Sequence, residues 1–292
     1  MSNHPSLDSL IPSLAIKALM YEVTVSPKPG LVDRFNNGSH QDMNFYTFVD
    51  SVLSFQPFFK QYYMAGKELS HCSDLNQLFF RSREIGIQAE KAMFDATNGI
   101  NTHKGANFSF ALLLIGIGYL VEREQLTHWT PVHSDDLFNI IQLMTKDHLL
   151  KDFDEVHNKQ KHTHGEKLYL QHGITGIRGE AVNGYPILKN ILLPYFRSYA
   201  GELNEYILLK GLVLTMGHIE DGNIIYRGGM EAWQLVKQES LALFNEKLNP
   251  EEFLLAVHDY DQILIERHLS PGGAADALSL GIFLYLLESA FV

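Results

Sequence analysis

One short polar stretch of the sequence combines residue types that bind and react with anionic substrates. Residues 101–106 read Asn-Thr-His-Lys-Gly-Ala and stand directly before an apolar run, residues 108–121. Asn101 or Thr102 can cap a helix that starts there, and the free N–H groups of its first turn favour anions. Lys104 adds a positive charge. The simpler alternative is a capped core helix with an exposed lysine. The functional interpretation is that reactive groups begin a helix that leads into the protein core.

A second polar segment, residues 28–42, contains two of the residue types that acid–base chemistry needs. Prolines and glycines interrupt helical periodicity here. Its charged and titratable side chains are Lys28, Asp33, Arg34, His40 and Asp42. On local pattern alone, solvated charge in a turn between helices is the favoured interpretation.

A third stretch, residues 173–181, places three glycines near an arginine and a glutamate. Glycine permits close backbone approach or a positive φ. The planar fork of Arg178 is suited to phosphate, and Glu180 is expected at the start of a short helix. A glycine-rich hinge would give the same pattern.

Two further stretches precede the C-terminus. Residues 218–223 follow an apolar helix, and the acidic Asp221 beside an asparagine could hold Mg²⁺ through oxygen ligands. Residues 270–276 read Ser-Pro-Gly-Gly-Ala-Ala-Asp and open the last helix. Serine, glycines and free helix N–H groups form a plausible phosphate cradle, although the ending of a P-loop is missing.

The composition of the chain excludes several classes of protein. The chain has 292 residues, 46% of them hydrophobic, one cysteine and a formal net charge of −11. A single cysteine excludes an intramolecular disulfide and a cysteine metal cluster, and the acidic balance argues against a nucleic-acid surface. The N-terminus lacks the pattern of a signal peptide, and the run at 108–121 is shorter than the roughly 20 residues of a membrane span. We therefore expect a cytoplasmic protein without a membrane segment.

The periodicity predicts an all-α fold, a single multi-helix domain over residues 1–292 with a buried central helix. Strand patterns are few. The expected helices cover residues 6–25, 44–66, 75–97, 108–121, 137–150, 206–217 and 274–290. Residues 151–165 are rich in charge and contain His157, His162 and His164. A mobile polar loop is favoured there over a metal site.

Taken in order, four of these stretches resemble the motifs of the triphosphoribosyl-dephospho-CoA synthase family. They are Lys28-Pro-Gly-Leu-Val-Asp33, Asn101-Thr-His-Lys-Gly-Ala106, Arg178-Gly-Glu-Ala181 and Ser270-Pro-Gly-Gly-x-Ala-Asp276. Their order and spacing match over nearly the whole chain. Gly222 and Ala274 depart from the family pattern, in which threonine and serine are frequent.

The resemblance implies an all-α enzyme that transfers the triphosphoribosyl group of ATP to the 2′-OH of 3′-dephospho-CoA and releases adenine. Such a reaction passes through an oxocarbenium-like state and needs a carboxylate, a donor for adenine and a held triphosphate. On this basis we assign catalysis to Glu180, Asp33 and His103. Substrate binding is assigned to Lys28, Arg34, Asn101, Lys104, Arg178, Arg227, Ser270, Gly272 and Gly273. Mg²⁺ is expected with ATP, on Asp42, Asp221 and Asp276.

The implied product is the prosthetic-group precursor for the acyl carrier protein of citrate lyase, with malonate decarboxylase as the sister pathway. A homodimer is the expected assembly. Two other classes stay open at this point. One is a Mg²⁺-dependent hydrolase of N-glycosidic bonds, such as an ADP-ribose glycohydrolase. The other is a non-catalytic nucleotide-binding protein.

Overall fold

The computed structural model describes residues 6–199 and 201–291. Within these ranges the chain is helical and forms no strand, which confirms the predicted all-α class. The helices are α1 (Leu7–Thr24), α2 (Phe45–Ser54), α3 (Gln56–Glu68), α4 (Asn76–Ala96), α5 (Lys104–Arg123), α6 (Pro131–Glu155), α7 (His164–His172), α8 (Gly176–Val182), α9 (Leu193–Arg197), α10 (Glu205–Met216), α11 (Gly222–Asn245), α12 (Pro250–Glu266) and α13 (Gly272–Ser289). A 3₁₀ turn (Val156–Asn158) and a π-helical turn (Leu188–Leu192) complete them.

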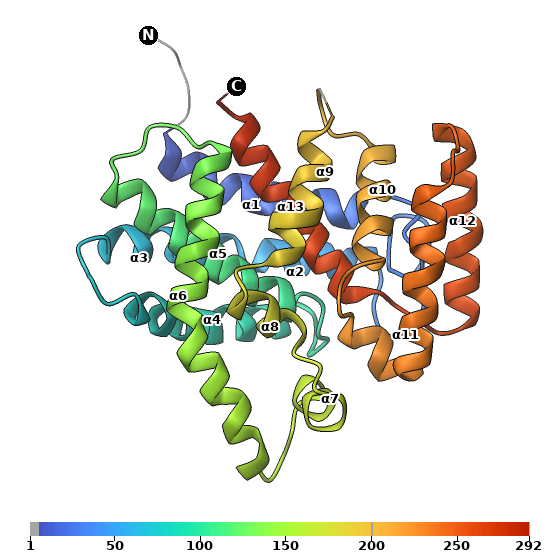
Figure 1. The fold of residues 1–292 in the computed structure, drawn as a ribbon, viewed down its shortest axis with the longest axis horizontal. Coiled ribbons are helices and arrows are strands. Elements are labelled where there is room, and N and C mark those ends of the chain that lie inside the picture. The colour runs from blue at the N-terminus through green and yellow to red at the C-terminus, as the bar shows by residue number, and fades with distance from the viewer. Residues whose placement is uncertain (1–5, 200, 292) are drawn as a thin grey trace.

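Two apolar helices, α5 and α13, form the centre of the molecule. Helix α3 packs along α5, and α1 packs along α13. Helices α4 and α6 also contact α5, while α10, α11 and α12 form the opposite side, with α12 at the edge (Figure 1). One continuous hydrophobic core runs from Ile11 to Leu287. Chain segments far apart in the sequence therefore share one interior.

Helix α5 is the buried central helix that the sequence predicts. Its residues from Ala106 to Val121 are almost all buried, because core side chains surround it on every face. At 20 residues, α5 is longer than the predicted 108–121 segment, and by length and composition alone it could cross a membrane. Its burial inside the protein is what identifies it as a core helix.

Close contact between the α3 and α5 backbones depends on glycine. A Cβ atom on Gly66 would lie 2.0 Å from the carbonyl oxygen of Ile115. On the facing helix, a Cβ on Gly118 would lie 2.0 Å from the carbonyl oxygen of Tyr63. Both distances are far inside van der Waals contact, so any side chain at either position would force the two helices apart.

Several predicted helix boundaries are wrong for local reasons. The segment 44–66 forms two helices, α2 and α3, which meet at Phe55. Pro57 stands in the first turn of α3 and has no N–H for the carbonyl of Leu53, so one continuous helix is disfavoured. Helices α11 and α12 are absent from the prediction altogether. Helix α11 also contains a kink at Gly229, where φ is 80°.

The region after α5 differs most from the prediction. Helix α6 begins at Pro131 and ends at Glu155, well beyond the predicted 137–150. It starts at a reciprocal cap between Thr130 and His133, a variant of the capping box with histidine in place of the usual acid. The predicted polar loop 151–165 thus shrinks to a short connection around the 3₁₀ turn, and α7 begins at His164.

Candidate active site

The N-termini of the two central helices meet, and carboxylates from elsewhere cap them. Asp276, in the first turns of α13, accepts a hydrogen bond from the Ala106 N–H at the start of α5. A Cβ on Gly105 would lie 2.2 Å from Asp276 Oδ2, so glycine is required for this approach. Asp221 Oδ2 in turn accepts from Ala274 N at 2.9 Å at the start of α13. Three of the sequence motifs therefore come together at one point.

Asp221 is fixed by backbone groups of two helices. As the N-cap of α11, its Oδ1 accepts from Asn223 N at 2.9 Å and from Ile224 N at 3.2 Å. Burial nevertheless raises the pKa of Asp221 to about 6. Burial, with the nearby charges of Glu22 and Asp221, raises the pKa of Asp276 well above its ordinary value. The charge of Asp221 thus disfavours the ionised form of Asp276.

A buried ion pair lies next to these aspartates. Lys28 Nζ lies 2.5 Å from Glu22 Oε1, and both side chains are at most 4% exposed. The interpretation of the 28–42 loop as solvated charge is therefore wrong at Lys28. Charge is buried here because each partner neutralises the other. Glu22, Lys28, His103, Asp221 and Asp276 are referred to below as the buried cluster.

Asp33 organises the loop that carries Lys28. Its Oδ2 accepts from Lys28 N at 3.0 Å, and its Oδ1 accepts from Phe35 N at 2.7 Å and Asn36 N at 3.1 Å. Asp33 is buried, so a second part of the loop departs from the solvated interpretation. Asp261 of α12 holds the same loop by accepting from Gly30 N at 2.8 Å. The loop is thus tied to α12 by a carboxylate.

His103, rather than Asn101 or Thr102, is the N-cap residue of α5 and makes no side-chain capping bond. The expected cap is therefore wrong: Asn101 is exposed, and Thr102 donates to Ser51 Oγ at 2.7 Å. Ser51 Oγ in turn lies 2.8 Å from His103 Nδ1.

The surroundings of His103 decide its charge. The rings of Phe48 and Phe55 contact its imidazole edge-on. Its Nε2 is buried without a hydrogen-bond partner among the described residues. Burial, helped by the charge of Lys28, lowers the pKa of His103 to about 3. The imidazole is therefore neutral at pH 7, and any role as a donor is that of a neutral N–H.

Glu180 lies in α8, beside the helix connection that contains Asp221. Its Oε2 accepts from Ile187 N at 3.0 Å, and the side chain is half-buried. Burial raises the pKa of Glu180 to about 7, and the charge of Glu220 adds to the increase. Such a carboxyl can gain and lose a proton near neutral pH. Arg178, two residues earlier in the same helix, is half-buried and forms no ion pair among the described residues.

The other predicted cations lie on the exposed side of the site. Arg34 Nη2 pairs with Glu205 Oε1 at 2.6 Å, and Lys104 Nζ pairs with Glu90 Oε1 at 2.5 Å. Arg227 donates to the carbonyl oxygens of Ser39 and His268 at 3.1 and 3.2 Å. Arg34, Lys104 and Arg227 are referred to below as the outer cations. All three are solvent-exposed, so salt and water screen them.

The polar and glycine residues at the start of α13 contact neighbouring parts of the protein. Ser270 Oγ lies 2.9 Å from His40 Nε2. A Cβ on Gly272 would lie 2.5 Å from Asn223 Nδ2, and one on Gly273 would lie 3.1 Å from Asp221 Oδ2. The two glycines therefore let the ends of α11 and α13 approach each other.

The three carboxylates assigned to a metal do not form one cluster. Asp221 and Asp276 are neighbours, whereas Asp42 is exposed and lies 3.7 Å from His40 Nδ1. No group of three or more potential metal ligands occurs within the described part of the chain. Both oxygens of Asp221 already accept backbone hydrogen bonds, so Mg²⁺ bound with a nucleotide would have to share them, with phosphate oxygens and water as the other ligands. Bound Mg²⁺ would also relieve the repulsion between Asp221 and Asp276.

The histidines of the former loop region are used in other ways. His162 Nε2 lies 3.0 Å from the Val156 carbonyl oxygen, and the His164 ring contacts Tyr226. Within the described residues they contact other protein groups, and the predicted mobile loop is replaced in part by the end of α6 and the start of α7.

Two buried carboxylates of this region, Glu22 and Asp261, are absent from the sequence-based site. Glu22 does leave a signal in the sequence. It lies on the face of α1 that otherwise carries Ala15, Ala18 and Leu19, where an unpaired charge would be costly. An acid on a buried helix face, close before a lysine, indicates a buried ion pair. Asp261 also lies on the buried face of its helix, α12, which the prediction lacks, but its partners are Gly30 N and Asn36 Nδ2 rather than a cation.

Comparisons with known proteins agree with this geometry. Residues 8–292 match the model of the CitG family, described as ATP:dephospho-CoA triphosphoribosyl transferase. A protein of Streptococcus mutans, named "Probable 2-(5''-triphosphoribosyl)-3'-dephosphocoenzyme-A synthase", is 46% identical over 94% of this chain and 95% of its own length. A protein of the same name from Streptococcus equi subsp. zooepidemicus is 48% identical over 96% of this chain and 97% of its own.

A Streptococcus pyogenes protein of that name is 46% identical over 95% and 96% of the two chains. No solved structure matches. The model match and these identities over nearly the whole length show that the chain belongs to the ATP:dephospho-CoA triphosphoribosyl transferase family.

Proposed function

We propose that this protein transfers the triphosphoribosyl group of ATP to the 2′-OH of 3′-dephospho-CoA and releases adenine. The observation that carries the proposal is the meeting of the 101–106 and 270–276 motifs at the paired N-termini of α5 and α13, with Lys28 of a third motif beside them. Helix N-termini attract phosphate oxygens, and the same point holds carboxylates for the sugar chemistry. A non-catalytic binding protein would not need Glu180 with a pKa of about 7 beside this point.

Each of the three residues assigned to catalysis has its own part in the reaction. The 2′-hydroxyl oxygen forms a bond to C1″ of the ATP ribose, and the electron pair of the bond between C1″ and nitrogen leaves with adenine. Glu180 takes the hydroxyl proton, while the departing adenine nitrogen gains a proton from solvent. His103 offers a neutral N–H to the adenine, in accordance with its lowered pKa. Asp33 acts by holding Lys28 and its loop in place.

The triphosphate is retained in the product, so it must be held without being cleaved. Lys28, Arg178 and the outer cations supply positive charge, and Asn101, Ser270, Gly272 and Gly273 line the approach. Asp221 and Asp276 would hold Mg²⁺, which supplies charge neutralisation for the phosphates when bound. Asp42, near His40, could join them only through water.

The biological setting follows from the product. We place it upstream of an acyl carrier protein, that of citrate lyase in the first instance, in the cytoplasm and in a homodimer. Malonate decarboxylase is the alternative destination, and the same chemistry would serve it.

Incubation with ATP, Mg²⁺ and 3′-dephospho-CoA, followed by mass analysis, tests the proposal. We expect free adenine and an adduct in equal amounts. CoA should be a poor acceptor, because its 3′-phosphate crowds the neighbouring 2′-OH. Adenine release without any acceptor would show a hydrolase. Tight ATP binding without release of adenine would show a binding protein, and either result would overturn the proposal.

A further inference from the structure

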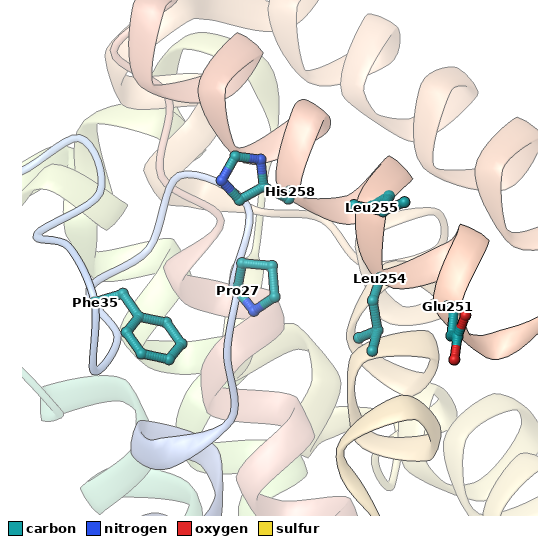
Figure 2. A pocket seen from close by; sticks show the side chains of 6 residues that line it. All are labelled: Pro27, Phe35, Glu251, Leu254, Leu255 and His258. Carbon is teal, nitrogen blue, oxygen red and sulfur yellow. The ribbon is translucent and has the colours of Figure 1, made fainter.

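A shallow apolar groove lies on the outer side of the 28–42 loop, against α12. Pro27 and Phe35 form one wall, and Leu254, Leu255 and His258 of α12 form the other, with Glu251 at one end (Figure 2). Its volume of about 440 Å³ lies within the range of small-molecule sites. This groove therefore lies open to solvent beside the loop that carries Lys28.

The groove exposes large apolar side chains that the described fold leaves uncovered. Phe35 is 77% exposed and Leu255 is 68% exposed. They come from segments more than 200 residues apart in the sequence, yet line the same depression (Figure 2). Facing apolar side chains of this kind commonly mark a binding surface.

A positive charge stands beside the groove. The guanidinium of Arg34 lies 5.3 Å from the centre of the Phe35 ring. Its Nη2 and Nε contact Glu205 and Ser26, while its Nη1 makes no hydrogen bond within the described residues. An arginine with a free donor can bind a phosphate oxygen. The groove is therefore apolar along its length, and next to one wall stands an arginine that is paired with Glu205 but keeps one free donor.

The groove and the buried cluster lie on the two sides of the same loop. Lys28 and Asp33 point inward and are buried, whereas Pro27 and Phe35, immediately outside them, line the groove. One loop therefore presents Lys28 to the buried cluster on its inner side, and Arg34 with the apolar wall on its outer side.

The geometry points to the groove as the site of the pantetheine arm of dephospho-CoA, with Arg34 at the diphosphate. This inference rests on the proposed function. The arm is an uncharged, extended chain with a dimethyl branch and amide groups, which suits apolar walls with a few polar atoms. The diphosphate complements Arg34 in charge. Contacts to this remote part of the acceptor hold the reacting hydroxyl in place.

A charge placed in the groove tests the inference. Leu255→Asp puts a carboxylate on the α12 wall and replaces none of the residues assigned to the reaction. Leu143→Asp on α6 is the matched control, because Leu143 is 64% exposed and does not line the groove. For each protein, the kcat and the KM for dephospho-CoA and for ATP are measured from adenine release. Light scattering on a gel-filtration column gives the oligomeric state.

We expect Leu255→Asp to raise the KM for dephospho-CoA by about tenfold, with kcat and the KM for ATP unchanged. Leu143→Asp should match the wild type. An unchanged KM for dephospho-CoA, or an equal rise for ATP, would overturn the inference while leaving the proposed function intact. An altered oligomeric state with an unchanged KM would assign the groove to a second copy of the chain. If the wild type releases no adenine with dephospho-CoA, the proposed function itself falls, and the inference with it.

Discussion

The buried cluster and the outer cations use the same chemistry in two environments. Lys28 with Glu22 and Lys104 with Glu90 both pair at 2.5 Å, but the Lys28 side chain is 2% exposed and that of Lys104 is 48% exposed. Water and salt screen the outer pair, so it contributes little to stability. The inner pair has lost its hydration and depends on its partner. Burial, rather than distance, decides how strongly each lysine is fixed.

Removal of the Lys28 charge should have the largest effect on stability. Lys28→Met leaves Glu22 buried without a partner, close to Asp276, and we expect a loss of about 3–5 kcal/mol in the free energy of unfolding. Urea denaturation measures it. The double variant Glu22→Leu/Lys28→Met should recover most of the loss, because no unpaired charge remains. If Lys28→Met lost less than about 1 kcal/mol in the free energy of unfolding, the Lys28–Glu22 pair would contribute no more than a solvent-exposed pair.

The loss of Glu180 should affect rate far more than stability. Glu180→Gln keeps the size of the side chain but removes the proton acceptor, so turnover should fall at least ~10²-fold. The melting temperature should change little. In the wild type, kcat/KM should fall as pH drops below about 7, since the base must be ionised. Near-native turnover in the variant would transfer the role to another carboxylate.

The paired aspartates should make the stability of the cluster depend on pH. The pKa of Asp276 is raised in the folded protein, so its contribution is fully present below the unfolded pKa near 3.8 and is lost as pH rises through the folded value. Relative to the wild type, Asp276→Asn should therefore gain in melting temperature between pH 4 and pH 8, by roughly 2 °C or more. A fall in the melting temperature of Asp276→Asn relative to the wild type over this pH range would show that Asp276 is ionised in the folded protein.

The same variant tests the expected metal. Mg²⁺ should raise the melting temperature of the wild type at pH 8 and have a smaller effect on Asp276→Asn, because one ligand is lost. Chelation with EDTA should abolish turnover of the wild type. Full activity in excess EDTA, or an equal Mg²⁺ response in both proteins, would leave the two aspartates as helix caps.

The smallest effect is expected at the surface. Lys104→Met should change the free energy of unfolding by less than about 1 kcal/mol, because its pair with Glu90 is exposed. If Lys104 meets phosphate, the KM for ATP should rise a few-fold at low salt, and the difference should shrink at high salt. A stability loss comparable with that of Lys28→Met would abolish the distinction between the two regions.

The sequence allowed the apolar helix α5 to be predicted, because burial on all faces leaves a strong local pattern. The polar stretches proposed for the site stood out by their glycines and charges, and their roles stay predictions. The sequence did not show which charges are buried. Lys28 and Lys104 both look like exposed lysines in their motifs, and only the packing of α1 and α13 separates them. Helix α6 was predicted too short, since its cap uses His133 and its outer half is polar.

The glycines of the α3–α5 contact have a genetic consequence. Gly66 meets the carbonyl of Ile115, and Gly118 meets that of Tyr63, so each side chain that could be added would push apart the same two backbones. Once one substitution has separated the helices, the second finds part of the space already made. Their energetic costs should therefore be less than additive. During divergence of the chain, the two positions would be expected to change together or not at all.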